Sequence, residues 1–257
     1  MKSGPELVDA ANLSLVGSYR TLVAHCPGGE IREDDGVFAF ATGLPLSLFN
    51  GCIVVGPTSA SEFEAALTWI GERGLPYRVW IDEERAPDLG GVALARGLDP
   101  DPVPYPGMVL HPVPDAPAPS PGVTVIPVTR ANLPEHLGVR VESGLPLDLA
   151  RRLFPPSFAA DPDVQLFTAR LDGRPVGAAA AIRSGDVAGV YAVGTLPAAR
   201  RRGVGTAATW AAVTAGRAWG CDTVVLQSSE IGYRMYSAMG FRTVVPYATF
   251  KRAVPQR

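Results

Sequence analysis

Residues 200–205 (RRRGVG) place three arginines and two glycines between two segments of different pattern. Residues 186–193 before them are short and largely apolar, which predicts a strand, and residues 206–219 after them predict a helix that ends at Gly220. A helix N-terminus has free backbone N–H groups and a dipole that favours negative charge, and glycine lets the backbone come close to a ligand. The segment therefore predicts an anion site, and a pyrophosphate is the guest that fits it best.

Two common phosphate-binding loops do not match this sequence. The P-loop requires G-x-x-x-x-G-K-[ST], and the lysines of the chain, Lys2 and Lys251, lie far from any such loop. The dinucleotide fingerprint G-x-G-x-x-G would require glycine where Ala208 stands, and it normally opens a domain. Both of these sites are therefore excluded.

The segment resembles the acetyl-CoA signature of the GNAT acyltransferases, R/Q-x-x-G-x-G/A. Arg200 takes the first position, Gly203 and Gly205 take the glycine positions, and Thr206 is the small polar residue that follows. Pro197 also stands where that family often has proline. The resemblance implies that this loop binds the pyrophosphate of CoA.

A second motif follows about 35 residues later. Residues 221–227 (CDTVVLQ) have the β-branched richness of a buried strand, and residues 231–239 predict a short helix that ends at Gly240. Residues 236–241 (YSAMGF) resemble the family's Y-x-x-x-G-F motif, whose tyrosine often protonates the departing CoA thiolate. The resemblance gives Tyr236 this role, and packing of the short helix is the alternative.

The other elements of the second half have the order of a GNAT domain. The predicted strands cover residues 123–129, 164–171, 175–183, 186–193, 221–227 and 241–251, the last interrupted at Pro246, and the predicted helices cover about 132–143, 145–154, 206–219 and 231–239. The order β-α-α-β-β-β-α-β-α-β predicts an α/β (α+β) fold with a mixed, mostly antiparallel sheet and flanking helices. The resemblance covers residues 121–257.

The first half has helix, strand and glycine signals in the order expected of a degenerate copy of the second. Residues 61–73 predict a helix, 77–83 a strand and 89–96 a second helix, and the glycines that end these helices lie 146 and 143 residues before Gly220 and Gly240. Residues 54–60 of this half carry no arginine and no G-x-G, so we expect no CoA pyrophosphate there. The sequence predicts two tandem GNAT-like domains, at 1–115 and 123–257.

A proline-rich stretch separates the two predicted domains. Prolines recur throughout residues 99–122, too often for continuous regular structure, although residues 108–110 (MVL) could form an edge strand. Residues 116–122 are then expected to be a stiff, extended linker.

The family register assigns further roles around the predicted active site. The backbone N–H of Val193 would donate to the thioester carbonyl, and Thr195 would contact the pantetheine arm. Tyr191 shares the face of Gly189 and Val193 in a strand, so these positions and Ser228 are expected to contact the acceptor, with a core role as the alternative for Tyr191. The complete set of expected cofactor contacts is Val193, Thr195, Arg200, Arg201, Arg202, Gly203, Val204, Gly205, Thr206 and Tyr236.

The general base is not evident from the sequence. Several GNAT enzymes carry a glutamate four residues before the N–H donor, and here that position is Gly189. Glu230, Asp186, Glu142 or a water held by Ser228 and Ser229 could take its place. Glu230 is the residue expected to be catalytic beside Tyr236 and Val193.

Composition narrows the choice of partners and compartment. The net charge of −2 gives no reason to expect nucleic acid or an anionic membrane as a partner, and no segment approaches the ~18 uninterrupted apolar residues of a membrane span. The three cysteines and three histidines show no disulfide or metal-ligand spacing, so we expect no metal and a reducing, cytoplasmic setting. Arginine replaces lysine almost everywhere, which is typical of a GC-rich bacterial genome.

The resemblance implies an acyl-CoA-dependent N-acyltransferase. It would move an acetyl or other short acyl group from CoA, its co-substrate, to the amine of a small molecule or peptide by direct attack. The alternative is a non-catalytic acyl-CoA-binding or regulatory protein, which has no use for a thiolate acid such as Tyr236. The chain is expected to act as a monomer or homodimer.

Overall fold

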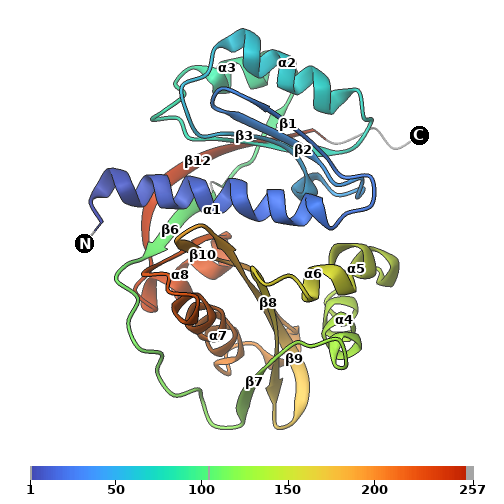
Figure 1. Cartoon of the computed structure of the whole chain (residues 1–257), viewed down its shortest axis with the longest axis vertical. Coiled ribbons are helices and arrows are strands. Elements are labelled where there is room, and N and C mark those ends of the chain that lie inside the picture. The colour runs from blue at the N-terminus through green and yellow to red at the C-terminus, as the bar shows by residue number, and fades with distance from the viewer. Residues whose placement is uncertain (1, 104, 253–257) are drawn as a thin grey trace.

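One continuous sheet runs through both halves of the chain (Figure 1). The computed structural model describes residues 2–103 and 105–252. Met1 and residues 253–257, which the predicted domains at 1–115 and 123–257 include, lie outside the described residues. The strand order is β1-β2-β3-β4-β12-β6-β11-β10-β9-β8-β7, with the short β5 paired to β12. Most neighbours are antiparallel, and the described parallel pairs are β3 with β4 and β10 with β11. The predicted fold class is confirmed.

The elements of the first half are α1 (Gly4–Ala24), β1 (Glu30–Asp34), β2 (Val37–Ala41), η1 (Ser47–Phe49), β3 (Asn50–Val54), α2 (Ala60–Gly71), β4 (Tyr77–Ile81), α3 (Leu89–Ala95), β5 (Asp99–Pro100) and β6 (Tyr105–Leu110). Those of the second half are β7 (Val123–Pro127), α4 (Leu133–Glu142), α5 (Leu147–Leu153), α6 (Pro156–Ala159), β8 (Val164–Leu171), β9 (Arg174–Ser184), β10 (Val187–Thr195), η2 (Pro197–Ala199), α7 (Val204–Ala218), β11 (Thr223–Gln227), α8 (Glu230–Ala238) and β12 (Arg242–Arg252).

The two halves exchange their last strands. Strand β6 of the first half lies between β11 and β12, with Val109 paired to Val225 on one side and to Arg242 on the other. In return, the last part of β12 pairs with β4, from Ala248 opposite Ile81 onward. The prediction of an edge strand at 108–110 is therefore wrong, because both edges of this apolar segment are hydrogen-bonded within the sheet.

Strand β12 changes partner near Pro246. Pro246 stands opposite Pro106 of β6, just after a register shift between Thr243 and Val245. Proline has no N–H to donate to the ladder, so a point where the strand leaves one partner for another accommodates it well. The strand continues through this residue instead of being interrupted there.

Helix α1 lies between the two halves (Figure 1), and the sequence analysis did not predict it. Its neighbours include β2 of the first half and β9, β10 and β11 of the second. Ala11 and Ser14 are fully buried, and so are polar positions such as Asn12, because the helix packs on more than one side. Burial around much of its circumference removes the single apolar stripe by which a surface helix is usually recognised.

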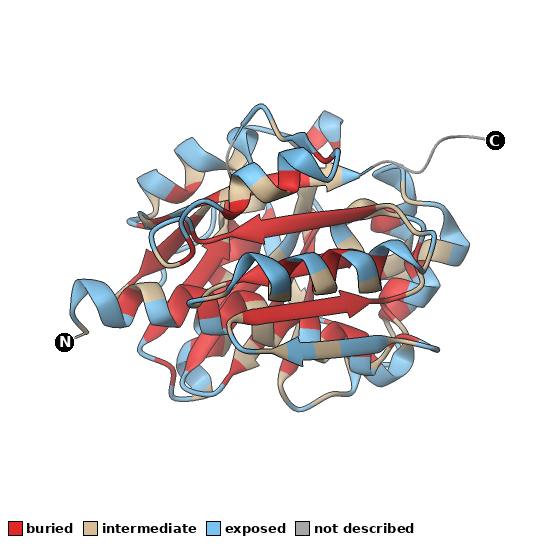
Figure 2. Cartoon of the chain, turned by 90° about the horizontal axis from the view of Figure 1, so that it is seen from above, coloured by how far each residue is buried: buried red, intermediate tan, exposed pale blue. Residues whose placement is uncertain are grey.

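The outer layers follow the ordinary pattern of apolar faces turned inward. Figure 2 shows buried central strands beneath helices whose outer faces are exposed, whereas the edge strand β1 is largely exposed. Helix α7 packs closely on the sheet through small buried residues such as Ala208 and Ala212, and alanine is also the residue that most favours a helix. No helix of the described residues is both long enough and apolar enough to span a bilayer.

Candidate active site

The sheet opens between β10 and β11. These parallel strands pair only from Val187 to Gly189, opposite Thr223 to Val225. Beyond that point β10 continues to Thr195 while Leu226 and Gln227 of β11 pair with β6 on their other side. The two strands therefore diverge towards their carboxyl ends and leave a gap that a thin ligand arm can enter.

A β-bulge lies in β10 beside this gap. The register with β9 jumps from Tyr191–Ala180 to Gly194–Ala178, so that Ala192 and Val193 share one residue of the partner strand. Ala192 has a φ of 51°, which a non-glycine residue adopts only when its surroundings enforce it. The bulge takes Val193, the expected N–H donor, out of the regular ladder.

The arginine–glycine loop follows β10 and leads into α7. Gly203 is the N-cap of α7 with a φ of 80°, and it provides no side-chain cap for the first N–H groups of the helix. The first turn also contains no acidic residue. Arg200 is exposed and donates through Nε to the Thr195 carbonyl at 3.3 Å. These N–H groups and cations therefore lie together at the end of the strand gap.

The other loop residues have different roles. Arg202 is exposed and pairs with Asp172 at 3.2 Å, and Val204 is buried in the core. A Cβ atom at Gly205 would lie 3.4 Å from the Thr195 Oγ1 and 3.3 Å from the Met235 Sδ, so any side chain there would narrow the space beside β10. Arg201 and Thr206 complete the loop, and Arg201 is itself held at a φ of 61°.

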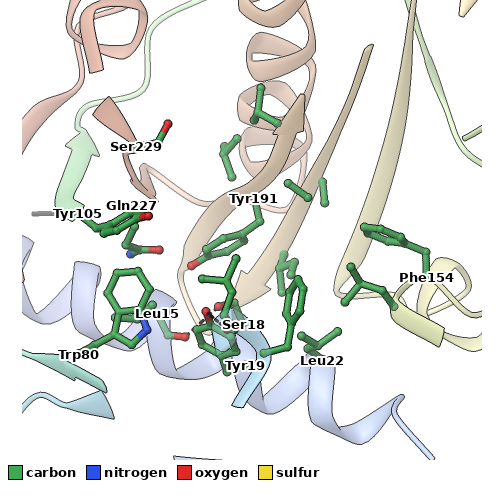
Figure 3. A pocket seen from close by; sticks show the side chains of 18 of the residues that line it. Leu15, Ser18, Tyr19, Leu22, Trp80, Tyr105, Phe154, Tyr191, Gln227 and Ser229 are labelled. Atoms are coloured by element: carbon green, nitrogen blue, oxygen red, sulfur yellow. Dashed lines mark hydrogen bonds between the residues drawn. The ribbon is translucent and has the colours of Figure 1, made fainter. Parts of the chain in front are cut away.

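A cavity of about 280 Å³ lies between the two halves, beside the gap (Figure 3). The second half contributes the bulge residues Ala192 and Val193 together with Tyr191 and Tyr236. The first half contributes residues of α1, η1, β4 and β6, among them Leu15, Ser18, Tyr19, Leu48, Trp80 and Tyr105. Sequence reasoning missed these first-half residues because only the strand exchange and the unpredicted α1 bring them to the site.

Tyr236 lines the cavity from α8. It is 8% exposed, and its ring meets Phe241 edge-on with 6.0 Å between the ring centroids. Gly232 leaves the space that the ring fills, since a Cβ there would lie 2.6 Å from it. Burial raises the pKa of Tyr236 to about 12, so the hydroxyl keeps its proton at neutral pH. The side chain is thus placed and protonated as a proton donor would need to be.

Tyr191 also lines the cavity, and it explains why Gly189 is a glycine. The Tyr191 hydroxyl is 2.8 Å from Ser14 Oγ of α1 and donates to the Ser14 carbonyl at 2.9 Å. A Cβ at Gly189 would lie 2.2 Å from the Tyr191 ring and 2.6 Å from Ser14 Oγ. The space at the position where the family resemblance would place a glutamate is therefore filled by a tyrosine ring and by α1, and Gly189 does not line the cavity.

The acidic candidates for the general base lie elsewhere. Glu230 is exposed at the start of α8, outside the lining of the cavity. Asp186 pairs with Lys2 at 2.9 Å, and Glu142 pairs with Arg174 at 2.9 Å. Ser228 is buried and donates to the Ser229 carbonyl at 2.8 Å, whereas Ser229 itself lines the cavity. The described residues that line the cavity include no carboxylate and no histidine.

A buried pair on α4 lies behind the bulge and was not predicted. Arg140 Nη1 donates to the Ala192 carbonyl at 2.6 Å, and Arg140 Nε donates to His136 at 3.3 Å. Burial lowers the pKa of Arg140 to about 10, and burial together with the Arg140 charge lowers the pKa of His136 to about 3. His136 is therefore neutral, as an acceptor for the guanidinium must be. The i, i+4 spacing of the two residues is the signal in the sequence, but it does not reveal the strand that they reach.

The equivalent region of the first half differs in each of these features. Strands β3 and β4 stay paired from Gly51–Arg78 to Val54–Ile81, and the Asp82 N–H extends the ladder to the Val54 carbonyl at 2.9 Å. Helix α2 has a capping box in which Ser59 and Glu62 occupy its N-terminus. At β3, β4 and α2 this half therefore has neither an open strand pair nor a free helix start. Within the described residues no group of three or more His, Cys, Asp or Glu side chains is placed to hold a metal ion.

Comparison with known proteins agrees with this geometry. Residues 136–241 match the model of the acetyltransferase (GNAT) family. The chain carries a GNAT acetyltransferase domain. A GCN5-related N-acetyltransferase from Kribbella flavida is similar over 95% of this chain and 96% of its own, with 20% identity and a TM-score of 0.66. A tandem GNAT protein from the clavulanic acid biosynthesis pathway covers 98% of this chain and 97% of its own, with 12% identity and a TM-score of 0.59. A functionally unknown conserved protein from Staphylococcus epidermidis covers 88% and 94%, with 15% identity and a TM-score of 0.64.

These likenesses extend over both halves and support the shared fold. A search of curated protein sequences finds no significant match. The GNAT domain therefore accounts for the order of elements in the second half, and the particular chemistry has to be argued from the residues of this chain.

Proposed function

We propose that the chain is an acyl-CoA-dependent N-acyltransferase of tandem GNAT architecture that moves an acetyl or other short acyl group to the amine of a small molecule or peptide. The observation that carries the proposal is the single path formed by the α7 N-terminus, the β10–β11 gap, the bulge at Val193 and the cavity at Tyr236. This path has one end for a pyrophosphate and the other for an acceptor.

The CoA would lie along this path. Its pyrophosphate would take the backbone N–H groups of residues 201–206, with Arg200 and Arg201 supplying positive charge. Its pantetheine arm would pass Thr195 and Gly205 into the gap. The thioester carbonyl would then accept a hydrogen bond from the Val193 N–H, and an N–H aimed at a developing oxyanion contributes about 2.7–4 kcal/mol.

The transfer would be a direct displacement. The unprotonated amine attacks the thioester carbon, the new C–N bond forms, and the C–S bond breaks as the tetrahedral intermediate collapses. Tyr236 donates its proton to the leaving sulfur and is reprotonated from solvent. The proton lost by the amine passes to water beside Ser229, because the cavity lining within the described residues holds no carboxylate or imidazole to take it.

The same lack of a base is the one feature that favours the alternative of a non-catalytic acyl-CoA-binding protein. The two functions differ in their use of Tyr236, because a hydroxyl in the cavity lining can donate a proton in a transferase and has no such role in a protein that only binds CoA. Release of free CoA thiol in the presence of a panel of amines separates them directly.

The CoA site is tested by Gly205→Val. The substitution should weaken acetyl-CoA binding by tenfold or more in calorimetry, since the new side chain narrows the space between Thr195 and Met235. Gly205 does not have a left-handed backbone, so the Gly205→Val protein should fold. Gly203 is unsuitable for the same test, because its φ is 80° and a Cβ there would lie 2.2 Å from Ser120 Oγ. Gly71→Val in α2, where a Cβ meets nothing within 4 Å, is the matched control. Unchanged affinity in a folded Gly205→Val protein would refute the proposed path.

A further inference from the structure

The cavity between the halves has an apolar, aromatic wall and no built-in negative charge. Leu22 and Phe154 line one end, and Trp80, Tyr105 and Gln227 line the other (Figure 3). Phe158 also lines the cavity, with its ring centroid 6.3 Å from that of Phe154. The ammonium groups of a polyamine or aminosugar lose water when they enter a cavity, and burying them without a partner is costly. Sites for such ligands therefore usually provide carboxylates. None of the described lining residues carries a carboxylate.

Two buried guanidinium groups lie against the aromatic residues of this wall. The Arg78 guanidinium lies 4.8 Å from the centre of the Tyr105 ring and 5.9 Å from that of Trp80. It is buried and pairs with Asp101 at 3.5 Å. On the opposite side, the Arg140 guanidinium lies 4.8 Å from the centre of the Phe154 ring. Asp101 offsets the charge of Arg78, whereas no carboxylate of the described residues pairs with Arg140, so the Arg140 charge further disfavours an acceptor with more than one positive charge.

Two hydrogen-bond donors of the cavity have no partner within the described residues. They are the indole N–H of Trp80, a residue only 2% exposed, and the amide nitrogen Nε2 of Gln227. Both residues lie at the same end of the cavity (Figure 3). Buried donors are normally satisfied, because an unsatisfied one destabilises the folded protein. An acceptor oxygen at this end of the cavity would supply the partner that these donors lack.

We infer that the acceptor is a small monoamine with an apolar body and a carbonyl oxygen, such as the amide of a hydrophobic amino acid. The inference rests on the proposed acyl transfer and names the substrate class of that site. The apolar body would lie towards Phe154 and Leu22, and the carbonyl oxygen would accept from Trp80 and Gln227. A volume of about 280 Å³ is just below the usual range of ligand pockets, about 300–1,000 Å³, and fits a compact molecule of this kind.

Three amines test the inference with the full-length protein and acetyl-CoA: L-phenylalaninamide, phenethylamine, which lacks the carbonyl, and spermidine. With kcat/KM expressed per unprotonated amine, so that the different basicities of the amines do not enter, we expect the value for L-phenylalaninamide to exceed that for phenethylamine by about tenfold, the gain of satisfying a donor at roughly 1.4 kcal/mol, and that for spermidine by a hundredfold or more. Calorimetry with each amine in the presence of CoA measures binding independently of turnover.

Two variants locate the effect. Trp80→Phe keeps an aromatic ring but removes the N–H, so it should reduce the advantage of L-phenylalaninamide over phenethylamine to about twofold or less. Trp69→Phe in α2, outside the cavity lining, should leave the advantage intact. Gln227→Glu introduces a carboxylate at the same end and should shift the preference towards spermidine by at least tenfold.

The results separate the inference from the proposed function. If acetyl-CoA fails to bind, the proposed transferase path is wrong. If acetyl-CoA binds but spermidine is the best substrate, or neither apolar amine binds or reacts, the inference is overturned while the CoA site stands. Octanoyl-CoA that binds far more tightly than acetyl-CoA and displaces L-phenylalaninamide would also overturn it, because the apolar end would then hold the acyl chain.

Discussion

Replacement of Tyr236 by phenylalanine should separate proton transfer from packing. The ring is 8% exposed and held by Phe241 and the space above Gly232, and phenylalanine keeps these contacts. Burial alone, with no hydrogen bond to another described residue, accounts for the raised pKa of Tyr236, so the change in unfolding free energy should stay below about 0.5 kcal/mol. Acetyl-CoA affinity should also be nearly unchanged.

Turnover should fall because the leaving sulfur loses its proton donor. A positioned general acid contributes about 10²–10⁴-fold, which corresponds to about 2.7–5.5 kcal/mol in the barrier. The assay is release of CoA thiol at saturating acetyl-CoA with any accepted amine. Tyr233→Phe, on the same helix with a 43% exposed side chain, controls for loss of a phenol hydroxyl. Turnover within about twofold of the parent in the Tyr236→Phe protein would return Tyr236 to a packing role.

Three further outcomes follow from the site. Because the described cavity lining holds no base, kcat/KM should rise about tenfold per pH unit up to the pKa of the acceptor amine itself and shift with that pKa; a break near pH 6–7 that is the same for all amines would contradict this. Native mass spectrometry should find one CoA per chain, because Ser59 and Glu62 occupy the N-terminus of α2, and a second CoA at modest excess would be evidence against it. Arg140→Met should lower kcat about tenfold with little change in CoA affinity, because it removes the hydrogen bond to the Ala192 carbonyl that fixes the bulge; an unchanged kcat would show that the bulge holds its shape without it.

The sequence predicts best those features that depend on local signals. The turn at Gly203 and the alanine-rich helix after it lie close to where their glycine and helix signals place them, and so do the strands and helices from residue 164 to 239. Val193 and Tyr236, two of the expected site residues, line the same cavity, whereas the roles of the loop residues stay predictions. These positions were accessible because each is fixed within a few residues by a glycine, a cap or a strand pattern.

The features that were missed depend on contacts between distant segments. Burial on several sides hides α1 from an amphipathic pattern, and nothing near residues 105–110 indicates that their strand pairs with β11 and β12. From the sequence alone, glycine at position 189 suggests only that the general base is missing. In the structure it follows from the Tyr191 ring and Ser14, which leave no room for any side chain at that position.

The two halves of the chain differ at their parallel strand pairs. In the first half the parallel strands β3 and β4 remain paired, and a Cβ at Gly51 would lie 1.7 Å from the Arg78 carbonyl, so no ligand arm can pass between them. The exchanged strand β6 and helix α1 instead bring Tyr105 and Ser14 against the open half. If the chain were cut after residue 115, the second half alone would lack β6 beside β11 and would also lack the first-half wall of the cavity. The strand exchange therefore joins the stability of the GNAT domain to the shape of the cavity beside it.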